Sequence, residues 1–100
     1  MMDDYKAAIA DLDSLIRIRD NDAGLFYARG YWHEYTDDLQ SAASDYKRCL
    51  ALDQRYYEAY FGLAFVYKQL GNIDLACETL KQAVEEGSQI SEDLRRTYCR

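Results

Sequence analysis

Side chains that could carry out chemistry are few in this sequence, and their spacing does not fit a catalytic or metal site. His33 is the only histidine, so a site built on two histidines is excluded, and no cysteine stands at a spacing that suggests a pair with it. Acidic pairs such as Asp37 and Asp38 fall near expected helix ends, where capping and solvation explain them. There is no nucleophile elbow and no glycine-rich phosphate loop. We therefore expect no enzymatic activity and no cofactor.

The three cysteines are Cys49, Cys77 and Cys99, an odd number without a C-x-x-C spacing. This count implies neither a disulfide framework nor a zinc site. We expect reduced, buried thiols in a cytoplasmic protein. The first residues lack the basic region and apolar core of a signal peptide, and no apolar run approaches the roughly 20 residues of a membrane span.

Acidic residues outnumber basic ones by 18 to 12, which gives a net charge of −6. Binding to nucleic acids and anionic membranes is driven by lysine and arginine, so neither is an expected partner. Of the 100 residues, 49% are apolar and none is proline. This composition suits a single all-helical domain with a modest core.

Apolar residues recur at three- and four-residue spacing along the chain, which predicts α-helices. Turn residues separate these segments: Asp38 and Asn72 are expected to cap helix starts, and Gly71 suits the left-handed residue that ends a helix. The sequence predicts six helices and no strand. Their expected ranges are 3–19, 23–35, 39–52, 56–70, 73–86 and 91–100.

Residues 23–56 and 57–90 form one helix-turn-helix unit written twice, at an offset of 34 residues. Few positions are identical, but residue classes agree, as in Phe26 with Tyr60 and Leu50 with Val84. Shifted by the same offset, residues 3–19 match the second helix of a unit, so we expect a partial repeat there and a capping helix over 91–100. A fixed period with two helices per unit is the signature of a stacked helical repeat.

The double unit resembles the tetratricopeptide repeat, a helix pair with the pattern W-x₂-L-G-x₂-Y, then A-x₃-F, then P. The pattern positions hold Phe26, Arg29, Gly30, His33, Ala42 and Tyr46 in the first unit, and Tyr60, Leu63, Ala64, Tyr67, Ala76 and Leu80 in the second. Gln54 and Ser88 replace the final proline. The resemblance implies a right-handed α-solenoid in which small residues allow close helix packing. It also gives His33 a packing role.

Arg29 departs from the leucine of this pattern on a face turned toward the partner helix, where a charge needs an acid. Asp45 lies on that helix, and in the next unit both residues change together, to Leu63 and Thr79. We therefore expect a largely desolvated ion pair between Arg29 and Asp45. Asp11 holds the place of Asp45 in the leading partial repeat. Either it is simply solvated, or a further helix precedes it in a longer protein.

A second stripe, rich in aromatic residues, runs along the first helix of each unit. In the family that the chain resembles, these helices line a concave groove that receives a peptide or helix, which implies a partner-binding groove here. Its expected residues are Tyr27, Tyr31, Glu34, Tyr35, Glu58, Phe61, Phe65, Lys68 and Gln69. Tyrosine suits an interface because it combines a large apolar body with a polar tip. Alternatively, the stripe packs internally, against a neighbouring first helix or the C-terminal helix.

These observations predict a non-enzymatic protein–protein interaction module that binds a peptide or helix segment in the aromatic groove. Some members of the family grip a C-terminal carboxylate through lysine and asparagine, but aromatic residues hold those places here, so we do not expect that specificity. The alternative is an assembly element that self-associates or continues a longer solenoid. A homodimer could then form through the N-terminal edge, because residues 3–19 lack a first helix to cover their apolar face.

Overall fold

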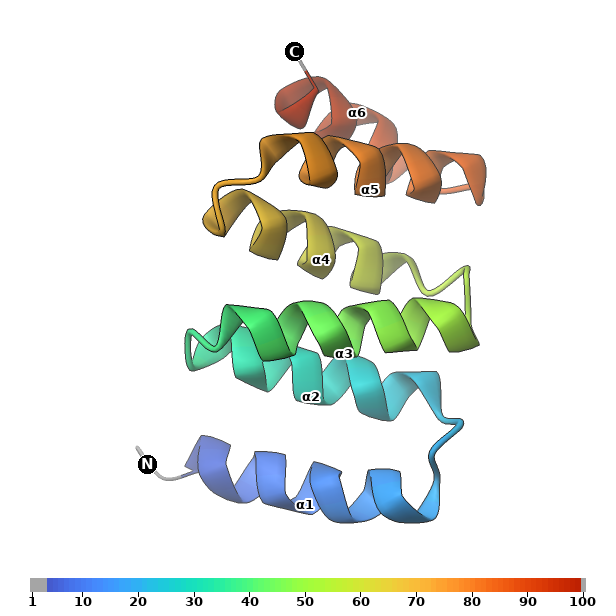
Figure 1. The fold of residues 1–100 in the computed structure, drawn as a ribbon. Helices are drawn as coiled ribbons and strands as arrows, with labels where there is room; N and C mark the ends of the chain where they lie inside the picture. Colours follow the sequence, from blue (N-terminus) through green and yellow to red (C-terminus); the bar gives the residue numbers. More distant parts are fainter. Residues whose placement is uncertain (1–3, 100) are drawn as a thin grey trace.

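A computed structural model of the chain describes residues 4–99, except for the side chains of residues 90–92. Six α-helices follow one another in this range, stacked from the N-terminal to the C-terminal end (Figure 1). They are α1 (Asp4–Ile18), α2 (Ala23–Tyr35), α3 (Leu39–Leu52), α4 (Tyr57–Gln69), α5 (Ile73–Glu85) and α6 (Ile90–Tyr98). The predicted bounds at residues 3 and 100 lie outside the described residues.

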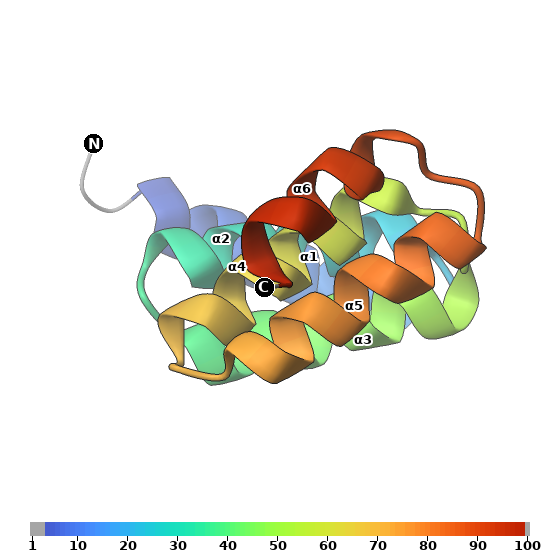
Figure 2. The ribbon, with the colours of Figure 1, turned by 90° about the horizontal axis from the view of Figure 1, so that it is seen from above.

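The helices form two layers. Each helix packs on its neighbours in sequence, and α2 also contacts α4. Viewed down the stack, α2, α4 and α6 lie toward one side, and α3 and α5 lie toward the other (Figure 2). This is the arrangement of a helical-repeat solenoid, so the predicted all-α fold is confirmed.

Capping residues set the helix ends. The side chains of Asp38 and Asn72 each accept a hydrogen bond from a backbone N–H three residues later, at 3.4 and 3.1 Å, as predicted. Gly71 has a φ of 83°, the left-handed conformation expected at a helix end. Asp37 holds the same place one repeat earlier, with a φ of 65°. The turns inside the two full repeats therefore share one geometry.

The core between the layers depends on small side chains. These small residues are all buried, namely Gly30, Ala42, Cys49, Ala64, Ala76 and Ala83. Larger side chains fill the space around them, chiefly Phe26, Tyr46, Leu63 and Leu80. Removal of this apolar area from water is the main force that holds the stack together.

At the N-terminal end of the stack, α1 is only partly covered. None of its residues is fully buried. On its apolar face Tyr5, Ile9, Leu12 and Ile16 are half-buried, but Leu15 of the same face is 40% exposed. Ile18 is 78% exposed. Since α1 packs on α2, one neighbouring helix covers part of its apolar surface and leaves the rest in water.

Candidate functional site

Three aromatic side chains of the predicted groove lie exposed on α2 and α4. Tyr31, Tyr35 and Phe65 are 52%, 69% and 40% exposed, and we call these three residues the aromatic face. Tyr31 and Phe65 occupy equivalent places in their repeats, and α2 contacts α4 directly. The repeat geometry therefore predicts that both rings lie on one surface.

Two residues outside the predicted groove set support this face. The ring of Trp32 lies edge-on to Tyr31 and Tyr35, with centroid distances of 5.9 and 5.8 Å. The ring of Tyr5 in α1 lies 6.3 Å from that of Tyr35. Aromatic pairs at such separations attract each other, which holds the exposed rings in place. Trp32 is the only tryptophan. Tryptophan is enriched at interfaces, and this is the sequence signal by which it could have been found.

Tyr46 connects the core to the same surface. Its ring extends from α3 between Gly30 and Gly62, where an added Cβ would lie only 3.0 and 2.6 Å from ring atoms. Its hydroxyl donates a hydrogen bond to the Glu34 carboxylate at 2.8 Å. Burial, followed by this bond to Glu34, raises the pKa of Tyr46 well above its ordinary value. Glu34 lies one helical turn after Tyr31, so a negative charge is held beside the aromatic face.

Tyr27, also predicted in the groove, is half-buried and packs against other aromatic rings. Its ring lies 5.7 Å from that of Tyr46 and 5.1 Å from that of Tyr56. Burial, and next the charge of Glu58, raise the pKa of the Tyr27 hydroxyl. Glu58 itself is exposed in the first turn of α4.

The C-terminal helix packs beside a different part of the predicted groove set. Phe61 is half-buried and packs against the same core cluster as Leu94 and Tyr98 of α6. The Lys68 ammonium lies 5.4 Å from the centroid of the Tyr98 ring, which is a cation–π contact. Gln69 is exposed at the end of α4. Some residues of the predicted set are therefore exposed and others are packed internally, and the groove itself stays a prediction.

Arg29 joins three helices through two carboxylates. Its Nε and Nη2 atoms donate to the two carboxylate oxygens of Asp45 at 2.9 and 2.8 Å, and its Nη1 donates to Asp13 of α1 at 2.8 Å. The side chains of Arg29 and Asp45 are 23% and 7% exposed, so this contact is largely desolvated. The hydrogen bond to Asp45 raises the pKa of Arg29 above its ordinary value. Asp13 was not singled out from the sequence, and the repeat-equivalent Asp11 is exposed.

His33 lies next to the same contact. Its Nε2 atom is 3.7 Å from Asp45 and its Nδ1 atom is 3.8 Å from Asp38, distances too long for hydrogen bonds. Its side chain is half-buried, and the packing role implied by the resemblance stays a prediction. Within residues 4–99, no three His, Cys, Asp or Glu side chains are grouped as the ligands of a metal ion would be.

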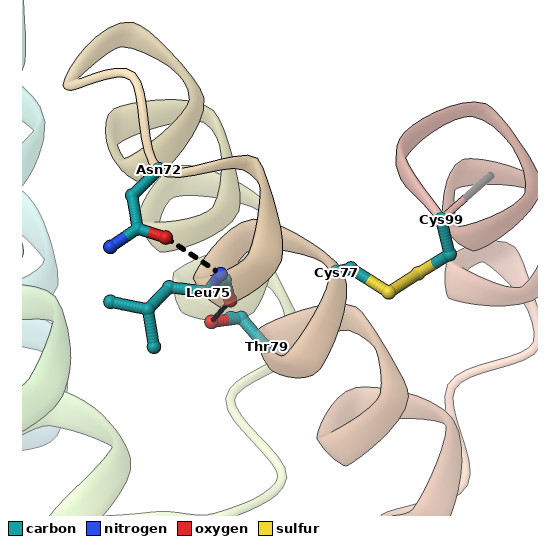
Figure 3. The surroundings of a disulfide bond; sticks show 5 residues. All are labelled: Asn72, Leu75, Cys77, Thr79 and Cys99. Atoms are coloured by element: carbon teal, nitrogen blue, oxygen red, sulfur yellow. Dashed lines mark hydrogen bonds between the residues drawn. A yellow bond between two sulfur atoms is a disulfide. The ribbon is translucent and has the colours of Figure 1, made fainter.

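The expectation of three reduced thiols was wrong for two of the cysteines. Cys77 in α5 and Cys99 after α6 form a disulfide, with their Cα atoms 5.1 Å apart (Figure 3). They are 22 positions apart in sequence, and the turn between α5 and α6 brings them together, which residue spacing alone does not reveal. Cys49 is a free, buried thiol. Burial raises its pKa to about 12, which keeps it protonated and unreactive.

The tetratricopeptide repeat family model matches residues 36–95 of the chain. The chain belongs to the tetratricopeptide repeat family. The resemblance seen in the sequence is thereby confirmed, and the repeats of this family generally mediate protein–protein interaction. Among the helices of the described range, none is long and apolar enough to cross a membrane.

Solved structures of tetratricopeptide repeat proteins share this fold. A MamA structure has a TM-score of 0.78 and 27% identity, covering 81% of this chain and 47% of MamA. The P58(IPK) tetratricopeptide domain has a TM-score of 0.85 and 24% identity, with 95% and 27% covered. The first tetratricopeptide domain of Spaghetti (RPAP3), bound to the HSP90 peptide SRMEEVD, has a TM-score of 0.81 and 18% identity. The match covers 94% of this chain and 78% of that domain's chain. The chain thus spans 47% and 58% of two MamA structures. Among curated proteins there is no significant match.

Proposed function

We propose that this chain is a non-enzymatic interaction module whose aromatic face binds a segment of a partner protein. The observation that carries the proposal is the exposure of Tyr31, Tyr35 and Phe65 in the folded chain. Apolar area left in water costs about 25 cal/mol per Å², and clustered exposed aromatic residues are typical of interaction sites. Membership of the tetratricopeptide repeat family supports the same function.

Charges near the aromatic face favour a partner segment with a basic group. Tyr46 holds the Glu34 carboxylate beside Tyr31, and Glu58 is exposed on α4. The Lys68 ammonium, in turn, contacts an aromatic ring of α6. The RPAP3 domain binds the acidic peptide SRMEEVD, whose charge these glutamates would repel. We therefore expect apolar anchors for the exposed rings and a lysine or arginine near Glu34.

The test uses a partner segment identified by cross-linking in the native host and measures its Kd by calorimetry. Replacing Tyr31 and Phe65 by alanine should raise the Kd by a factor of about 30 or more, because hot-spot residues contribute roughly 2 kcal/mol or more. Leu75→Ala is the matched control, since Leu75 on α5 is as exposed as Phe65, at 40%. Equal affinity of the double variant and the parent chain would refute the proposal.

A second candidate function is assembly through α1. The exposed side chains of Leu15 and Ile18 favour it, because apolar surface left in water favours association. Light scattering over a range of concentrations separates the two functions: a monomer at every concentration would exclude self-assembly. Ile18→Asp should shift a dimer toward monomer, whereas Leu75→Asp should not.

The cytoplasmic location expected from the sequence remains a proposal. The disulfide between Cys77 and Cys99 bears on it, because disulfides persist in oxidising compartments and are rare in the cytosol. In the cytoplasm this bond would be reduced, and α6 would lose its covalent link to α5.

A further inference from the structure

Two apolar side chains, four residues apart, attach α6 to the stack. Leu94 and Tyr98 are half-buried and pack, like Phe61, on a core cluster of α4 and α5. That cluster consists of Ala64, Ala76 and Leu80. Among residues 93–98, whose side chains the structure describes, the exposed ones are polar, namely Asp93, Arg96 and Thr97. The helix therefore covers an apolar surface with one face and presents the other to water.

The disulfide adds a restraint that α6 needs. The helix has 9 residues, fewer than the about 12–15 at which an isolated helix is even marginally stable in water. A short turn joins its start to α5, and the bond between Cys77 and Cys99 joins the residue after its end to α5 as well (Figure 3). With this bond intact, both ends of α6 are held on the surface that it covers.

The disulfide lies where a small reductant can reach it. Cys77 and Cys99 are half-buried, and both line a surface cavity of about 530 Å³. Lys68 and Lys81 line the same cavity. Asp74 lines it too, so two lysines face one carboxylate. The excess of positive charge favours the thiolate that forms when the bond is attacked, and with it thiol–disulfide exchange.

We propose that the surface of α4 and α5 beneath α6 is a docking site for a partner helix, and that the Cys77–Cys99 bond decides whether α6 or the partner occupies it. A dithiol supplies the two electrons: one of its thiolates attacks a sulfur and displaces the other cysteine as thiolate, which takes up a proton. Its second thiol then resolves the mixed disulfide, which leaves two cysteine thiols and an oxidised dithiol. Reduction releases the end of α6 and uncovers Phe61.

The contacts of α6 indicate which residues the partner helix needs. It should have an apolar residue at the place of Leu94 and an aromatic residue four positions later, at the place of Tyr98. A ring there also meets the Lys68 ammonium. The inference rests on the proposed function, because Phe61 lies one helical turn before Phe65 and its exposure lengthens the aromatic surface of α4.

A fluorescent peptide with the sequence of residues 90–98 is the probe. Its binding to the full chain is measured by anisotropy with the disulfide intact and after addition of a small dithiol, and hydrogen exchange of amides 93–98 is followed in the same samples. Reduction should lower the Kd of the peptide by at least about tenfold and speed α6 exchange by a similar factor relative to α3. Unchanged exchange or unchanged peptide affinity would overturn the proposal.

Two variants show whether the response belongs to this bond. Cys99→Ser should bind the peptide equally with and without the dithiol, as the reduced parent does. Cys49→Ala is the matched control: it removes the third cysteine, copies Ala83 at the equivalent place of the next repeat, and should keep the full response. A redox response that persists in Cys99→Ser would also overturn the proposal, since another group would cause it.

The failure of this proposal can be told apart from that of the proposed function. Replacing Tyr31 and Phe65 by alanine leaves the surface beneath α6 in place, so the redox response to the peptide should remain. If the parent lacks this response while the double variant loses partner binding, only the docking site is refuted. If the response is present and the double variant binds the partner normally, only the aromatic-face function is refuted.

Discussion

The Tyr46 hydroxyl donates a hydrogen bond to the Glu34 carboxylate across 2.8 Å. Tyr46 belongs to α3 and Glu34 to α2, so the bond ties a core side chain to the surface that carries the aromatic face. The ring reaches this surface because Gly30 and Gly62 leave room for it. A phenylalanine, which the repeat pattern has at this position, would fill the same space without holding the carboxylate.

Tyr46→Phe should therefore lower the free energy of unfolding by about 1.5–3 kcal/mol, the range for a hydrogen bond to a charged group. Urea denaturation followed by circular dichroism measures it. Tyr57→Phe is the control, because the Tyr57 hydroxyl donates to the neutral backbone carbonyl of Glu86 and its loss should cost only about 0.5–1.5 kcal/mol. Identical denaturation curves for Tyr46→Phe and the parent would show that the bond contributes nothing.

Gly62→Ala should destabilise the chain, although alanine is favoured over glycine in a helix by about 1 kcal/mol. The added Cβ would lie 2.6 Å from the Tyr46 ring, and overpacking of this kind costs about 1–3 kcal/mol. Adding Tyr46→Leu should relieve the clash, because Ala28 and Leu12 hold the corresponding places one repeat earlier. Thermal unfolding of both variants measures this, and a higher Tm for Gly62→Ala alone would contradict it.

Asp45→Ala should destabilise the chain by about 3–5 kcal/mol, because it leaves the partly buried Arg29 guanidinium without its main partner. Arg29→Leu combined with Asp45→Thr, which copies Leu63 and Thr79 of the next repeat, should restore much of the loss. Asp13→Ala is the control: Asp13 is 46% exposed, so its pair should contribute about 0–1 kcal/mol. Chemical denaturation that gives Asp45→Ala and Asp13→Ala equal stability would mean that the Asp45 contact is not buried.

Stability should fall at alkaline pH. Burial raises the pKa of the Cys49 thiol from 9.0 to about 12 and also raises that of the Tyr46 hydroxyl above its ordinary 10.0. The folded chain thus holds protons that the unfolded chain releases. The stability from this source is complete below about pH 9 and is lost as the pH rises toward about 12. Urea midpoints across this range should decrease, less steeply in Cys49→Ala and Tyr46→Phe, and a constant midpoint would disprove the linkage.

The sequence alone determined the repeat architecture, because the interactions that create it act between residues close in the chain. Caps such as Asp38 and Asn72 act within one helical turn, and the period of 34 residues places small side chains wherever a helix meets its neighbour. The joint change from Arg29 and Asp45 to Leu63 and Thr79 also pointed to a contact that the structure contains.

Only the tertiary structure decided which predicted groove residues are exposed. α6 does not continue the repeated pattern, so periodicity could not place it. In the structure it packs on the same cluster as Phe61, while Phe65 is left in water. The same packing brings Cys77 and Cys99 together. Such contacts depend on how whole helices lie against each other, and the spacing of residues along one helix carries no record of that arrangement.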